Sequence, residues 1–154
     1  MRKLLASLAV LACAFPAAAG ARVHGPGDGT LSVRDARGTF TVNARGGVIG
    51  TFARGRVVIT DPDPNDGTGP IVTGDDWHKD RSDTTTVYGG TKVRFRLIGG
   101  LFKIRVIGVG VNLSVVGRGT VGLTGEGTAD DGTYSIDGGD YVSVPETATS
   151  FTLP

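Results

Sequence analysis

One acidic segment, residues 74–83, brings together the residue types that acid–base or sugar-binding chemistry uses. It holds four carboxylates, a histidine and Trp77, the only tryptophan of the chain. Two carboxylates would act as acid and base on a glycan, with Asp75, Asp76 or Asp80 in these roles and Trp77 as the surface on which a sugar stacks. The alternative is a solvated loop, because neighbouring loop residues rarely hold the fixed separation that a catalytic pair needs.

A second candidate site is the turn-like sequence of residues 61–67, which is similar to the start of a calcium-binding loop. Asp61, Asp63 and Asp66 place oxygen ligands close together before a glycine, as calcium loops do before their sharp turn. The glycine comes one position late, two prolines stiffen the segment, and no glutamate closes it. These three aspartates are the candidate metal ligands and calcium is the only candidate cofactor. An ordinary Asp- and Pro-rich turn is the alternative.

A third candidate is a basic face on residues 91–107. If Gly99 and Gly100 form a two-residue turn, the flanking stretches pair as a β-hairpin whose basic residues lie opposite one another on one face. Like charges in opposite positions destabilise a hairpin, so an anionic ligand or neighbouring carboxylates should offset them. The candidate ligand-binding residues, with the stacking tryptophan, are Lys92, Arg94, Arg96, Lys103, Arg105 and Trp77.

Composition narrows the function classes further. The chain has 16 Lys and Arg against 15 Asp and Glu, which is not the basic excess of a nonspecific nucleic-acid binder. It contains no Gly-x-Ser-x-Gly nucleophile motif. We therefore expect no nucleic-acid partner, and nothing in the sequence positively supports an enzyme.

The N-terminal residues have the layout of an export signal. Met1-Arg2-Lys3 is a basic head, residues 4–15 are an apolar run, and small residues follow up to Ala21. We expect residues 1–21 to be a cleaved signal peptide and the protein to be secreted, periplasmic or part of the cell envelope. Lipidation of Cys13 is an alternative; if Cys13 leaves with the signal, the mature chain has no cysteine for a disulfide. We expect no transmembrane segment in the mature chain.

The elements that must position these residues are strands. Glycine accounts for 26 of 154 residues, more than twice its usual share of about 7%. The glycines separate short stretches in which apolar and polar residues alternate with period two, a pattern typical of strands with one buried face. Residues 22–154 are therefore predicted to form a single all-β domain with no helix, folded as a Gly-rich antiparallel barrel or sandwich. A β-solenoid is the alternative.

A repeat is also present in the sequence. Adding 62 to the positions of Arg34, Gly38, Phe40 and Gly46 reaches residues of the same type, and adding 64 does so for Arg54, Gly55, Val57, Thr60 and Asp66. We predict two duplicated β-units at about 29–73 and 91–141, linked by an exposed Asp- and Pro-rich segment, residues 61–83.

These observations lead to three functional hypotheses. The first is a secreted, non-catalytic β-module of the cell envelope or extracellular space that binds an anionic polymer or a carbohydrate. The second is a glycan-acting hydrolase that uses the loop carboxylates. The third is a structural protein that associates with itself through its sheet edges. The oligomeric state is left open by the sequence.

Overall fold

The computed structural model describes residues 28–154, which form strands and no helix. The all-β prediction is therefore confirmed for this part of the chain, while the predicted signal peptide and Cys13 lie outside the described residues. No helix within residues 28–154 could cross a membrane. The elements, in chain order, are β1 (Gly29–Thr60), β2 (Ile71–Thr73), β3 (Trp77–Ser82), β4 (Thr85–Thr124), β5 (Thr133–Ile136), β6 (Val142–Ser143) and β7 (Thr149–Leu153).

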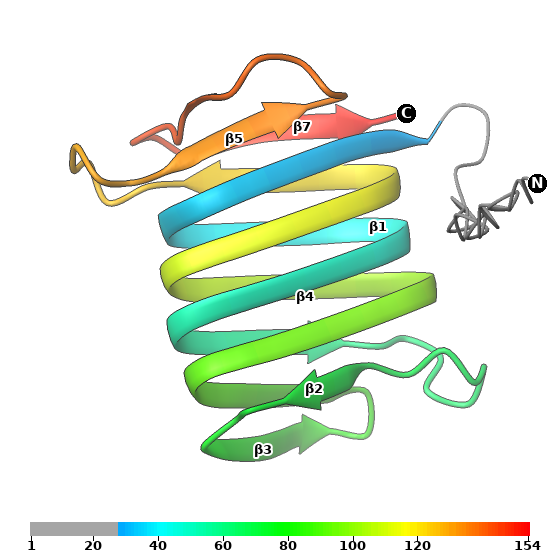
Figure 1. Ribbon diagram of the computed structural model, residues 1–154. Coiled ribbons are helices and arrows are strands. Elements are labelled where there is room, and N and C mark those ends of the chain that lie inside the picture. Colours follow the sequence, from blue (N-terminus) through cyan, green and yellow to red (C-terminus); the bar gives the residue numbers. More distant parts are fainter. Residues whose placement is uncertain (1–27) are drawn as a thin grey trace, which may run out of the picture.

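The two long strands β1 and β4 wind together around one axis and make up most of the fold (Figure 1). Residues in the middle of β1 pair with β4 on both sides. Val42, for example, pairs with Ile104 on one side and with Val121, 17 positions further along β4, on the other. One circuit of the coil therefore takes about that many residues. All seven strands belong to one antiparallel sheet. It is not closed into a barrel, so the barrel prediction is wrong.

Glycines form the corners of the coil. In β1 the corner residues Gly38, Gly46 and Gly55 have φ values of 139°, 149° and 153°. Residues other than glycine rarely adopt these backbone angles. The three glycines lie 8 and 9 positions apart, about half a circuit. A Cβ on Gly46 would also lie 2.2 Å from the carbonyl oxygen of Val116 on the neighbouring strand. The corners therefore require glycine for two reasons, the backbone angle and the close approach of the next strand.

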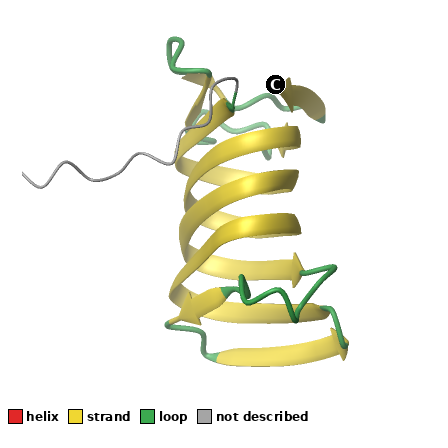
Figure 2. Cartoon of the chain, turned by 90° about the vertical axis from the view of Figure 1, so that its right-hand side faces the viewer, coloured by secondary structure: helices red, strands yellow, loops and turns green. Residues whose placement is uncertain are grey.

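The corners divide the coil into two walls, which we name after the short strands at their ends. The β5–β2 wall contains, from one end to the other, β5, residues 30–37, 109–116, 47–54 and 91–98, and β2. The β7–β3 wall contains β7, residues 118–124, 39–45, 101–107, 56–60 and 85–89, and β3. The loops that connect the short strands lie at the two ends of the coil (Figure 2).

The core lies between the walls. Alternate residues of every segment point inward, and the largest of them, Phe40, Phe52, Phe95 and Phe102, are fully buried. The alternation read from the sequence therefore assigned the inward face correctly. Burial of these apolar side chains is the main source of stability in a chain whose described part contains no disulfide.

The predicted hairpin at Gly99 and Gly100 is wrong. Both glycines have positive φ, 77° and 73°, as the proposed turn requires. Strand β4 nevertheless continues through them: Leu97 pairs with Val48 and Phe102 with Ala44. The two glycines make a corner of the coil, because β1 supplies hydrogen-bonding partners that a local hairpin would have replaced.

The connection between β1 and β4 caps one end of the coil. Residues 61–83 contain β2, which pairs with residues 94–96, and β3, which pairs with residues 85–89. Most of this segment is exposed, as predicted from its composition. Asp61 is an exception, being 6% exposed with its backbone N–H bonded to the carbonyl of Thr84 at 2.8 Å.

Candidate functional site

The five cations of the predicted basic face lie on two different walls. Lys92, Arg94 and Arg96 belong to the β5–β2 wall, whereas Lys103 and Arg105 belong to the β7–β3 wall. All five are exposed. The corner at residues 99–100 turns the chain from one wall to the other, so the cations that a hairpin would have brought face to face are separated by the core.

Lys103 and Arg105 occupy the middle of the β7–β3 wall. Lys103 pairs with Asn43 on one side and Thr60 on the other, and Arg105 pairs with Thr41 and Val58. Their immediate cross-strand neighbours are therefore uncharged. The repulsion between opposite cations that the hairpin hypothesis implied is therefore absent around Lys103 and Arg105. Elsewhere in this wall Arg45 lies opposite Arg118, which is ion-paired with Asp28 at 3.3 Å.

Two further cations from β1 extend this group across the wall. Arg45 is two residues from Asn43, the partner of Lys103, and Arg56 is two residues from Val58, the partner of Arg105. Such diagonal neighbours lie about 7–8 Å apart. The basic stripe, as we call these exposed residues, runs in the order Arg45, Lys103, Arg105 and Arg56.

Sequence reasoning missed Arg45 and Arg56. Both come from β1, more than 40 positions away from the two cations of β4. Their outward alternation with Ala44 and Val57, which are buried, was visible in the sequence. Only the register of β1 against β4 places them beside Lys103 and Arg105.

The strand segments that surround the basic stripe contain no acidic residue. None of the five central segments of the β7–β3 wall contains Asp or Glu. The Arg and Lys ion pairs found in residues 28–154 are Arg37–Glu126 and Arg118–Asp28, and neither includes a residue of the stripe. Acidic residues lie near the Arg45 end of the stripe: the pKa of Asp66 is lowered mainly by its hydrogen bonds from Thr68 and to a smaller extent by Arg45.

A shallow groove of about 330 Å³ lies over the middle of the stripe. Hydroxyl and amide groups stand beside the two central cations there, and together they offer hydrogen bonds and positive charge to an anionic group or to sugar hydroxyls. The polar residues that line the groove are Thr41, Asn43, Thr60, Lys103, Arg105 and Thr120.

Trp77 lies on the same wall, at its β3 edge. It pairs with Gly89, and Gly89 pairs on its other side with Arg56. A Cβ on Gly89 would lie 2.2 Å from Cζ2 of the indole, so the ring rests on the glycine. Trp77 is 50% exposed. The predicted stacking residue is therefore placed beyond the Arg56 end of the basic stripe.

No protein-family model, curated protein or solved structure matches this chain.

Three carboxylates of residues 74–83 are each engaged in a separate hydrogen bond or contact. Asp76 accepts hydrogen bonds from the backbone N–H of Thr91 at 2.9 Å and from its hydroxyl at 3.3 Å. Asp75 contacts Nδ1 of His78 at 3.3 Å. Asp80 accepts a hydrogen bond from the Thr86 hydroxyl at 2.6 Å. Each carboxylate has a different partner, and none of the three lines the groove described above.

The candidate calcium ligands are likewise not assembled. Within residues 28–154 no group of three or more Asp, Glu, His or Cys side chains is arranged to hold a metal ion. Oδ1 of Asp61 accepts a hydrogen bond from the N–H of Asp63 at 3.1 Å. Asp66 accepts hydrogen bonds from the N–H and the hydroxyl of Thr68, at 2.8 and 2.5 Å. These contacts are typical of Asp-rich turns.

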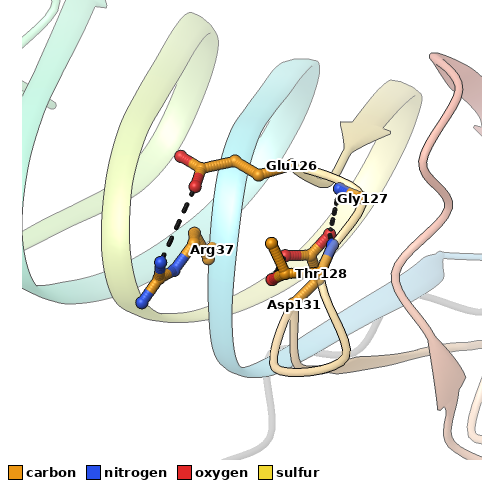
Figure 3. Close-up of polar contacts among 5 residues, drawn as sticks. All are labelled: Arg37, Glu126, Gly127, Thr128 and Asp131. Atoms are coloured by element: carbon orange, nitrogen blue, oxygen red, sulfur yellow. Dashed lines mark hydrogen bonds and ion pairs between the residues drawn. The ribbon is translucent and has the colours of Figure 1, made fainter.

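A buried carboxylate that sequence reasoning did not single out lies at the opposite end of the coil (Figure 3). Asp131 is 4% exposed and accepts hydrogen bonds from the backbone N–H groups of Gly127 and Thr128, at 2.7 and 3.1 Å, and from the Thr128 hydroxyl. The Thr128 hydroxyl is the main cause of a lowered pKa for Asp131. Nearby, Arg37 and Glu126 form an exposed ion pair at 3.8 Å. The Asp131 contacts hold the loop that follows β4.

Proposed function

We propose that this protein is exported and acts as a non-catalytic binding module of the cell envelope or extracellular space, with the basic stripe as the site for a linear anionic polymer such as an acidic carbohydrate. The observation that carries the proposal is the stripe of four exposed cations on a wall whose central segments lack Asp and Glu. Export rests on the signal-like residues 1–21.

The spacing of the cations favours a polymer over a small anion. Three steps of about 7–8 Å place the ends of the stripe roughly 20 Å apart. A single exposed ion pair contributes only about 0–1 kcal/mol. Binding therefore depends on several anionic groups of one chain meeting several cations, which multivalency makes effective. Trp77 extends the same surface and offers a ring on which a sugar can stack.

The test measures retention of the purified protein on a sulfated or carboxylated polysaccharide, with the uncharged polysaccharide as reference. The double substitution Lys103→Glu, Arg105→Glu should abolish retention. The matched control is Arg94→Glu, Arg96→Glu, which makes the same charge change on exposed strand positions of the other wall and should leave most of the retention. Circular dichroism of each variant establishes that it is folded.

Equal loss of retention in both double variants would show that net charge alone is responsible and would overturn the proposal. Absence of retention of the unsubstituted protein would overturn it as well.

The two alternative functions have less support. A glycan hydrolase would need two of Asp75, Asp76 and Asp80 to face one pocket, whereas each is hydrogen-bonded to a different partner. Self-association through the β3 edge is opposed by Lys79 and Arg81, because charged residues on an edge strand discourage pairing with another strand.

We also propose that the two halves of the coil arose by duplication. The register supports this: Val42 pairs with Ile104, its own equivalent at the offset of 62. On the other wall the offset of 64 relates Ile49 to Leu113 and Gly50 to Ser114. These four residues form the adjacent cross-strand pairs Ile49–Ser114 and Gly50–Leu113, so the point of symmetry lies between the two pairs. Both points suit one two-fold axis that passes through the two walls. In related sequences, matches between the halves should exceed background only at these two offsets.

A further inference from the structure

The β5–β2 wall exposes three isoleucines around one arginine. Arg96 pairs with Ile49 on one side and with Ile71 on the other, and Ile98 is the next outward residue along its own strand. The isoleucines are 55%, 58% and 52% exposed, in the order Ile49, Ile71, Ile98. We call these four residues the isoleucine patch.

The patch is continuous with an apolar groove. A hollow of about 320 Å³ lies beside it, lined in part by Ile49, Leu97, Ile98 and Val116. Its lining also includes Asp28, whose carboxylate is ion-paired with Arg118 at 3.3 Å. Exposed apolar side chains that occur singly are ordinary, but a contiguous group next to a groove marks an interaction surface. At the β5 end of the same wall the surface is already occupied, because Tyr141 donates a hydrogen bond to Ser32 at 2.7 Å and lies under the guanidinium of Arg34.

Cations border the patch along its own strand. Arg94 and Lys92 are the next outward residues after Arg96, at steps of about 7 Å. Neither these nor Arg96 belongs to an ion pair found within residues 28–154. The three segments 47–54, 91–98 and 109–116 contain no Asp or Glu. The surface therefore combines exposed aliphatic side chains with positive charge that no neighbouring strand neutralises.

We propose that the isoleucine patch, with Arg94 and Lys92, binds the surface of an anionic lipid bilayer. The isoleucines enter the boundary between headgroups and acyl chains, while the cations contact lipid phosphates. Charge complementarity selects anionic lipid as the occupant. Arg96 lies between Ile49 and Ile71 on the neighbouring strands, so aliphatic side chains can reach the acyl-chain boundary while the cation beside them contacts a phosphate.

This site is independent of the basic stripe. The stripe and the patch lie on opposite sides of the core and share no residue. Binding to lipid can therefore be tested separately from binding to an anionic polymer.

The test is co-sedimentation of the whole purified protein with vesicles of phosphatidylcholine that contain phosphatidylglycerol, with pure phosphatidylcholine vesicles as reference. The protein should sediment with the anionic vesicles only. Ile49→Ser, Ile98→Ser should reduce binding roughly tenfold, and Arg94→Glu, Arg96→Glu should reduce it at least as much. The matched control, Lys103→Glu, Arg105→Glu, should sediment like the unsubstituted protein.

Three outcomes would overturn the lipid proposal. One is absence of binding by the unsubstituted protein, and another is loss of binding in the Lys103 and Arg105 control equal to that in the patch variants. The third is unchanged binding after the isoleucine substitutions, which would leave no role for the patch. Retention on immobilised polyglutamate without vesicle binding would assign the surface to an acidic protein instead. Polysaccharide retention, measured on the same variants, separates failure of this proposal from failure of the polymer-binding proposal.

Discussion

The phenyl ring of Phe95 lies over Gly50, its paired residue on the neighbouring strand, and fills the space that a side chain there would occupy. A Cβ on Gly50 would be 2.1 Å from Cζ of the ring. Phe95 is only 2% exposed and belongs to the core between the walls. The ring of Phe95 therefore occupies the inward space beside Gly50, and this packing of the β5–β2 wall requires that residue 50 has no Cβ.

The substitution Gly50→Ala should lower the free energy of unfolding by about 2 kcal/mol, because the buried ring has no free space into which it can move. Chemical denaturation measures the change. Gly47→Ala is the control on the same segment: its Cβ would have no neighbour closer than the Leu97 carbonyl oxygen at 3.9 Å. We expect the control to stay within about 0.5 kcal/mol of the unsubstituted protein. Equal effects at the two positions would contradict the packing argument.

The corner glycines should be more sensitive still. Gly46→Ala places a Cβ 2.2 Å from a backbone oxygen of the next strand and forces a φ of 149° on an L-residue. The expected loss is at least about 3 kcal/mol, and thermal unfolding followed by circular dichroism would detect it. Gly69→Ala, at a loop position with nothing within 4 Å of the added Cβ, should be tolerated. A Gly46→Ala protein as stable as the control would show that the corners do not need glycine.

Gly89 offers an informative contrast, because the group above it is on an edge strand. The Gly89→Ala substitution should displace the half-exposed indole of Trp77 at a cost below about 1 kcal/mol. Since Trp77 is the only tryptophan, its fluorescence emission reports the displacement directly and should shift to longer wavelength. An unshifted emission maximum would mean that the ring does not rest on Gly89.

Stability should depend on the ionisation of Asp131. Its pKa is lowered in the folded protein from an ordinary value of 3.8, chiefly by the Thr128 hydroxyl. The stabilisation is therefore fully present above pH 3.8 and is lost as the pH falls through the folded pKa. Asp131→Asn should lower the free energy of unfolding at neutral pH, and the difference from the unsubstituted protein should narrow in acid.

The neighbouring exposed residue Asp130 provides the control for this pH dependence. Asp130→Asn should leave the free energy of unfolding at neutral pH close to that of the unsubstituted protein, since no hydrogen bond to its exposed side chain is found within residues 28–154. If the difference in free energy of unfolding between Asp131→Asn and the unsubstituted protein stays constant down to strong acid, the ionised carboxylate is not the source of that difference.

Local pattern in the sequence determined the strand content and the face of each side chain. Alternation with period two placed Val93, Phe95 and Leu97 in the core and Arg94 and Arg96 outside it, and this holds in the structure. Alternation is local, because successive side chains of a strand point to opposite faces whatever the strand pairs with.

Which strands are neighbours was decided only by the tertiary structure. The pair Gly99-Gly100 suits a hairpin turn and a coil corner equally well, because both need positive φ. The corner forms because β1 supplies hydrogen-bonding partners on one side of residues 91–98 and on both sides of residues 101–107. These partners lie more than 35 positions earlier in the chain. The same long-range register separates Arg96 from Lys103, and it brings Arg45 beside Lys103 and Arg56 beside Arg105. No local sequence pattern encodes the register of β1 against β4, because that register depends on how the apolar side chains of both walls pack together in one core.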